Sequence, residues 1–129
     1  MTKRVLVVED NELNLKLFCD LLKAHGFMAE PVRDAREALD RARAIRPDLI
    51  VMDIQMPHLS GLDLIEAIRG EEKLRHTPIM AVTAYAGKGD EDRVRTAGAD
   101  AFVSKPITLM RFMDSINALI EETEMRLPH

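Results

Sequence analysis

Five side chains in the sequence have the types needed for phosphoryl chemistry: Glu9, Asp10, Asp53, Thr83 and Lys105. Carboxylates brought within a few ångströms of one another repel, and a hard dication such as Mg²⁺, which prefers oxygen ligands, relieves that repulsion. Once the charge is neutralised, one carboxylate can attack a phosphorus atom and become an acyl phosphate. The hydroxyl and the ammonium group can then stabilise charge on the transferring group. This chemistry requires that the five side chains meet in one pocket.

The pattern of apolar residues predicts a fold that brings distant residues together. Short unbroken apolar runs alternate five times with stretches of helical periodicity. Unbroken apolar strands are typical of a parallel sheet covered on both faces, so we predict an α/β fold with a doubly wound, five-stranded parallel sheet. The polar tail from residue 121 is expected to fray. The strands are predicted at 5–8, 28–32, 49–52, 79–82 and 101–103, and the helices at 13–22, 35–45, 62–68, 90–96 and 109–120.

The five candidate side chains all follow the ends of predicted strands. Glu9 and Asp10 follow the first strand, Asp53 the third, Thr83 the fourth, and Lys105 comes shortly after the fifth. In a parallel sheet these ends share one edge, and ligands bind beyond that edge. Each residue also has a plainer interpretation, such as an acidic pair beside a helix N-terminus or a lysine in solvent. Their coincidence at one edge favours a common site.

Composition and length limit the function further. A chain of 129 residues accommodates one domain, and we expect residues 1–129 to form it. No apolar run approaches the roughly 18 residues of a membrane span, and the N-terminus has no signal-peptide core, so a cytoplasmic location without membrane contact is expected. The net charge of −4 argues against nucleic-acid binding. The single cysteine, Cys19, excludes an internal disulfide and is expected to be a buried apolar residue.

Four segments of the chain resemble the signature segments of receiver domains of two-component response regulators. They occur in the order expected for that family, and the resemblance covers the chain from Lys3 to about Glu121. The resemblance implies the flavodoxin-like, CheY-like (βα)5 fold, with residues 1–129 as a single receiver domain and no output domain. The four segments are Val7–Asn11, Met52–Pro57 with Ser60–Gly61, Val82–Ala84, and Ser104–Pro106.

The exact residues of two segments resemble one subgroup of this family in particular. Residues 8–14 and 84–91 are most similar to DivK-type single-domain response regulators, and they are also similar to receivers attached to hybrid histidine kinases. The DivK-type resemblance implies a role in cell-cycle or polarity control.

The resemblance implies a role for each pocket residue. Asp53 would be the phosphoacceptor and a Mg²⁺ ligand, Asp10 a direct Mg²⁺ ligand, and Glu9 a ligand acting through metal-bound water. The backbone carbonyl of Gln55 would complete the protein's share of the metal ligands. Lys105 would pair with a phosphoryl oxygen.

Further residues would sense or surround the phosphoryl group. Thr83 would be the switch hydroxyl, and Phe102 would stand where the family has an aromatic residue that swings inward when Thr83 moves. Ala84 would leave room for the phosphoryl group, Tyr85 would shield it, and Pro106 would turn Lys105 inward. For Asn14 a solvated helix residue is the favoured interpretation, and a place near the pocket mouth is the alternative.

The function implied is that of a phosphoacceptor signalling protein rather than an enzyme, with self-phosphorylation and slow self-dephosphorylation at most. The implied partners are a histidine kinase or histidine phosphotransfer protein, and a target that binds the face formed by the fourth helix, fifth strand and fifth helix. The protein would be a monomer or weak homodimer.

Three alternative functions remain: an interaction module without phosphorylation, a Mg²⁺-dependent phosphatase, and a flavin-binding protein. A phosphatase of the haloacid-dehalogenase type would need an aspartate where Gln55 stands, and a flavin phosphate would be repelled by Glu9 and Asp10.

Overall fold

A computed structural model describes residues 2–56, 60–83, 89–104 and 108–126 of the chain. The predicted strands are confirmed, and four of them gain one residue at one end. The elements, in chain order, are β1 Arg4–Val8, α1 Glu12–Ala24, β2 Met28–Val32, α2 Ala35–Ile45, β3 Leu49–Asp53, α3 Gly61–Gly70, the short 3-10 helix η1 Glu72–Leu74, β4 Ile79–Thr83, α4 Asp90–Ala97, β5 Ala101–Ser104 and α5 Leu109–Arg126.

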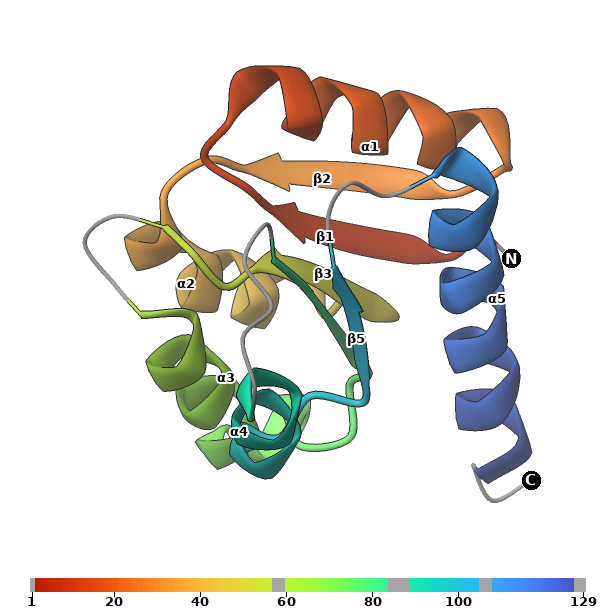
Figure 1. Cartoon of the computed structure of the whole chain (residues 1–129). Coiled ribbons are helices and arrows are strands. Elements are labelled where there is room, and N and C mark those ends of the chain that lie inside the picture. The colour runs from red at the N-terminus through yellow and green to blue at the C-terminus, as the bar shows by residue number, and fades with distance from the viewer. Residues whose placement is uncertain (1, 57–59, 84–88, 105–107, 127–129) are drawn as a thin grey trace.

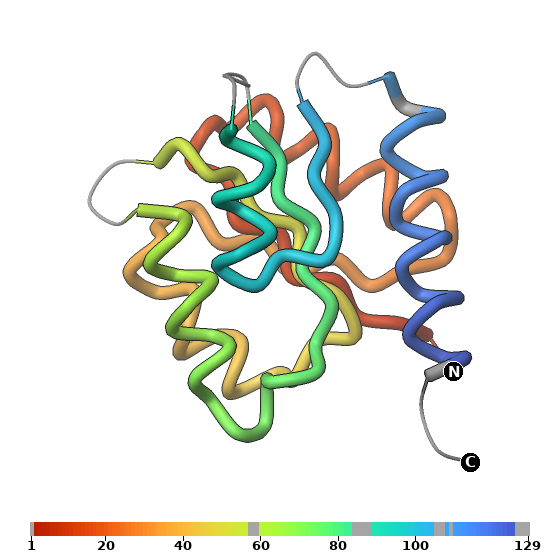
Figure 2. Tube along the Cα trace, turned by 60° about the horizontal axis from the view of Figure 1, so that its bottom comes forward, coloured from red at the N-terminus to blue at the C-terminus, as the bar shows by residue number. Residues whose placement is uncertain are grey.

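The five strands form one parallel sheet in the order β2-β1-β3-β4-β5. Helices α1 and α5 cover one face of the sheet, and α2, α3 and α4 cover the other (Figure 1). The edge strand β5 lies between α4 and α5, as Figure 2 also shows. The doubly wound α/β fold predicted from the apolar pattern is therefore confirmed.

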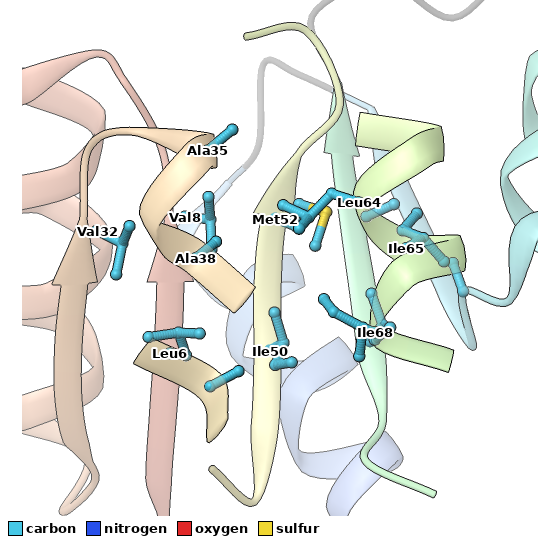
Figure 3. Packing of buried hydrophobic residues seen from close by; sticks show 14 of the residues in the cluster. Leu6, Val8, Val32, Ala35, Ala38, Ile50, Met52, Leu64, Ile65 and Ile68 are labelled. Atoms are coloured by element: carbon cyan, nitrogen blue, oxygen red, sulfur yellow. The ribbon is translucent and has the colours of Figure 1, made fainter. Parts of the chain in front are cut away.

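Each face of the sheet has its own hydrophobic core because successive strand residues point to opposite faces. Leu6 and Val8 of β1 contribute to the core under α2 and α3, which Figure 3 shows from close by. Val5 and Val7 contribute to the core under α1 and α5. In that second core the rings of Phe18 and Phe112 stack with their centroids 4.7 Å apart, which joins α1 to α5.

Helix α5 is longer than the sequence predicted. The expectation that the chain frays from residue 121 is wrong, because the helix continues to Arg126. The Thr123 hydroxyl donates a hydrogen bond to the carbonyl of Leu119 at 2.8 Å, and Glu124 forms an ion pair with Lys3 at 3.0 Å. The ion pair ties the last turns of the helix to the start of the chain. Nowhere in the described ranges is a helix both long enough and apolar enough to cross a membrane.

Candidate functional site

The register of the sheet sets two acidic residues side by side. Val8 pairs with Met52 in the β1–β3 ladder. Glu9 and Asp53 are the next residues on these neighbouring strands, so both lie at the carboxyl edge of the sheet. The backbone of Glu9 is held there by a hydrogen bond from its N–H to the carbonyl of Val32, at 3.0 Å.

Asp10 joins these two residues to form an acidic cluster, which we define as Glu9, Asp10 and Asp53. One carboxylate oxygen from each residue lies within 4.8 Å of the others. The side chains are removed from solvent to different degrees: Glu9 is 1% exposed and Asp53 6% exposed, while Asp10 is half-buried. Three carboxylates held this close, two of them buried, favour a bound cation because a cation offsets their mutual repulsion.

The oxygen donors of the acidic cluster suit Mg²⁺. This ion takes oxygen ligands at about 2.0–2.1 Å in octahedral geometry, so neighbouring ligand oxygens lie about 3 Å apart and opposite ones about 4 Å apart. The carboxylate oxygens of the cluster, within 4.8 Å of one another, are close to this spacing. Mg²⁺ also usually keeps several waters and binds phosphate oxygens, which matches a cluster in which Asp10 is half open to solvent.

The Asp53 carboxylate has a fixed orientation. Its Oδ1 accepts a hydrogen bond from the backbone N–H of Gln55 at 3.0 Å. The intervening residue, Ile54, donates its own N–H to the carbonyl of Val82 at 3.0 Å, which continues the β3–β4 ladder past Asp53. The side chain of Gln55 is exposed. The backbone immediately after β3 therefore both extends the sheet and orients the acidic side chain at its end.

Asn14 lies beside the acidic cluster, as the less favoured of its two sequence interpretations suggested. The prediction of a solvated helix residue is wrong, because Asn14 is half-buried and its Nδ2 donates a hydrogen bond to Oε1 of Glu9 at 3.0 Å. The one available signal was its place in the first turn of α1, three residues after the N-cap residue Asn11. A side chain in the first turn of a helix that follows a strand can reach back to the strand end.

Thr83 and Phe102 lie beside a common cavity of about 270 Å³. Thr83 ends β4 and is 3% exposed, and Phe102 on β5 is half-buried. Apolar side chains from three other parts of the chain complete much of the lining: Ile54, Leu62 and Val94. The predicted pair of switch residues is therefore brought together around a space between the strands and α4.

Four predicted site residues lie outside the described parts of the chain. They are Ala84, Tyr85, Lys105 and Pro106. The described residues that precede these two segments are neighbours, since Thr83 pairs with Ser104 in the β4–β5 ladder. Residues 84 and 105 therefore directly follow the ends of two neighbouring strands.

Known proteins are similar to this chain, some in sequence and others in fold. Residues 5–117 match the family of response regulator receiver domains. The polar-differentiation response regulator DivK of Brucella ovis is 52% identical over 120 residues, which is 93% of this chain and 98% of that protein. DivK of Brucella anthropi is 51% identical over the same shares of both chains.

Solved structures of receiver domains superpose closely. A CheY-like response regulator receiver domain protein from Methanospirillum hungatei has a TM-score of 0.92 at 26% identity, covering 98% of this chain and 100% of that one. The chemotaxis protein CheY4 of Vibrio cholerae has a TM-score of 0.88 at 25% identity, covering 92% and 99%. The signature segments, the parallel sheet and these similarities agree, and the chain belongs to the family of response regulator receiver domains.

Proposed function

We propose that the chain takes a phosphoryl group onto Asp53, in the presence of Mg²⁺, and signals by changing which proteins it binds. The observation that carries this proposal is the acidic cluster, in which Asp53 lies beside Glu9 and Asp10 at the carboxyl edge of the sheet. The donor would be a phosphohistidine on a histidine kinase or on a histidine phosphotransfer protein. The similarity to DivK supports a role in a phosphorelay, with cell-cycle or polarity control as its setting.

The transfer requires an oxygen of an oriented carboxylate as the nucleophile. An oxygen of Asp53 attacks phosphorus, the new O–P bond forms as the N–P bond of the phosphohistidine breaks, and the electron pair of that bond returns to the imidazole nitrogen. The hydrogen bond from Gln55 to Oδ1 holds the carboxylate plane during the approach, which lowers the entropic cost of alignment. Mg²⁺ held by the acidic cluster would supply positive charge to the phosphoryl oxygens. The Gln55 carbonyl is proposed as a further ligand.

Other groups would stabilise the transferred phosphoryl group. The Thr83 hydroxyl lies at the end of β4, next to the strand that ends in Asp53. Lys105 follows Ser104, the partner of Thr83, so we assign its ammonium group to a phosphoryl oxygen. Pro106 would orient Lys105, Ala84 would leave space for the phosphoryl group, and Tyr85 would limit its contact with water.

The acyl phosphate would bias an equilibrium between two conformations. Thr83 would move toward the phosphoryl group, and the half-buried ring of Phe102 would turn into the cavity beside it. Helix α4 offers the element that shifts, because Val94 is its only fully buried residue among the eight from Asp90 to Ala97. The face formed by α4, β5 and α5 would then change shape and present a different surface to a target protein.

The remaining properties follow from this role. We propose that the chain works as a single domain in the cytoplasm, as a monomer or weak homodimer, with no nucleic acid or membrane as its target. Catalysis would be limited to self-phosphorylation from small donors and slow self-dephosphorylation.

The test is incubation with Mg²⁺ and acetyl phosphate, followed by mass spectrometry of the intact protein. We expect an adduct of about 80 Da that is labile in base and absent from Asp53→Asn. Asp63→Asn provides the matched control, because Asp63 is an exposed aspartate in the first turn of α3. An adduct that persists in Asp53→Asn overturns the assignment. Failure of the wild-type protein to form any adduct supports the interaction module, and rapid release of phosphate supports the phosphatase.

A further inference from the structure

The start of α1 is tied to the acidic cluster by one side chain. The Asn14 side-chain amide donates to Oε1 of Glu9 at 3.0 Å. A carbonyl oxygen in that position would repel the carboxylate, so hydrogen bonding requires that the amide nitrogen face Glu9. Asn14 thus contacts a residue of the proposed metal site without belonging to that site.

The position of Asn14 is itself fixed by the helix cap. Its backbone N–H donates to Oδ1 of Asn11 at 3.0 Å, and the N–H of Leu15 donates to the Asn11 carbonyl at 2.9 Å. These two hydrogen bonds hold the first turn of α1 in place. The side chain of Asn14 therefore approaches Glu9 from a fixed helical turn, and its hydrogen bond helps to orient the Glu9 carboxylate.

Glu9 is almost fully buried, so hydrogen-bond donors to its oxygens matter. A buried carboxylate keeps its charge when donors bind to its oxygens, and a neutral amide supplies a donor without adding a charge that competes with a cation. An aspartate in place of Asn14 would instead bring a fourth carboxylate to the cluster. An amide is therefore well suited to this position.

We propose that Asn14 is a positioning residue that orients Glu9 for Mg²⁺ binding. This inference rests on the proposed function, since it assumes that the acidic cluster binds Mg²⁺. With Asn14 in place, the Glu9 carboxylate is held facing the other two carboxylates before the ion arrives. Without the amide, the carboxylate loses one of the contacts that orient it, and affinity for the ion falls. Residues in the outer shell of metal sites typically change affinity by roughly 10- to 100-fold.

The test is calorimetric titration of Mg²⁺ into the unphosphorylated protein. Asn14→Leu has nearly the same shape and keeps a good helix-forming residue, but it has no donor. We expect about tenfold weaker Mg²⁺ binding in Asn14→Leu. Asn14→Gln keeps the amide and is expected to recover most of the affinity. Asn117→Leu removes an exposed asparagine from α5 and serves as the matched control with unchanged affinity.

Thermal unfolding with and without Mg²⁺ separates positioning from general stability. A positioning role predicts that the rise in Tm caused by a fixed concentration of Mg²⁺ is smaller in Asn14→Leu than in wild type. Equal affinity and an equal rise in Tm in the two proteins would overturn the inference, as would a Gln variant as weak as the Leu variant. If the wild-type protein itself shows no saturable Mg²⁺ binding, the metal site of the proposed function fails, and the inference fails with it.

Discussion

The backbone of Gly61 lies directly against the backbone of Ile54. The N–H of Gly61 donates to the Ile54 carbonyl at 3.3 Å, and a β-carbon on Gly61 would lie 2.6 Å from the Ile54 Cα. Ile54 immediately follows the acidic residue Asp53, and Gly61 is the first residue of α3. This close approach joins the start of α3 to the strand end that carries the proposed phosphoacceptor.

Gly61→Ala is expected to destabilise the protein by about 2 kcal/mol, because the new methyl group meets backbone atoms that cannot move aside by a rotamer change. Urea unfolding measures the change. Gly70→Ala is the matched control, since a β-carbon at the last residue of α3 meets nothing within 4 Å. An alanine there is expected to leave the free energy of unfolding unchanged or slightly higher. Equal stability of the two variants would contradict this account of the close approach.

Arg69→Met is expected to cost about 2 kcal/mol of stability, because hydrogen bonds to a charged, half-buried group are lost together. The Arg69 guanidinium donates to the Gly98 carbonyl at 2.9 Å, the Thr77 carbonyl at 2.6 Å and Oδ2 of Asp100 at 2.7 Å. Those hydrogen bonds join α3 to the segments that immediately precede β4 and β5, at the edge of the sheet opposite the acidic cluster. Chemical denaturation measures the loss.

Arg43→Met provides the comparison for Arg69. Arg43 pairs with Asp40 at 2.9 Å and with Glu71 at 2.5 Å, but its side chain is largely exposed. Exposed ion pairs contribute little, so the free energy of unfolding is expected to change by less than about 1 kcal/mol. A larger loss in Arg43→Met than in Arg69→Met would show that burial does not determine the contribution of these arginines.

Cys19 is expected to react slowly with thiol reagents in the folded protein. The side chain is buried, as the sequence predicted, and burial raises the pKa of the thiol, so little reactive thiolate is present at neutral pH. With a disulfide reagent such as dithionitrobenzoate, we expect modification at least about a hundredfold slower in buffer than in urea. Fast modification under native conditions would show that α1 opens readily.

The raised thiol pKa also predicts a pH dependence of stability. The thiol ionises more readily in the unfolded chain than in the folded one, so its stabilising effect is complete below the ordinary pKa of about 8.5 and is lost as pH rises above it. The difference in unfolding free energy between wild type and Cys19→Ala is therefore expected to shrink in alkaline buffer. A difference that is constant from pH 7 to pH 10 would argue against the shift.

Thr83→Ala is expected to separate phosphorylation from the response of α4. The variant keeps the acidic cluster and still accepts a phosphoryl group, but it lacks the hydroxyl beside the cavity that Phe102 lines. Amide exchange in α4 is expected to change at least about fivefold on phosphorylation of wild type and to stay unchanged in Thr83→Ala.

Thr123→Ala removes a hydroxyl that hydrogen-bonds within α5 and serves as the control, with the wild-type response retained in α4. The switch hypothesis fails if α4 of the wild-type protein is as protected as the sheet both before and after phosphorylation.

Most of the fold was predictable because it depends on local patterns. The unbroken apolar runs at Val5–Val8 and Leu49–Met52 can be covered only in a sheet with helices on both faces, and the structure buries all of them. The end of α5 was not predictable in the same way. The ion pair between Lys3 and Glu124 joins the two ends of the chain, and no local pattern around residue 121 reveals it.

The candidate site also has one part that the sequence predicts and another part that it does not. The sequence alone was sufficient to predict that Glu9, Asp53 and Thr83 lie at the carboxyl edge of the sheet, because the carboxyl ends of parallel strands lie on the same side. Only the tertiary structure decided that Asn14 contacts Glu9, because this depends on how the first turn of α1 returns over the end of β1. It also decided the cavity between Thr83 and Phe102, since a cavity is set by the packing of several elements at once and not by the residue types of any one of them.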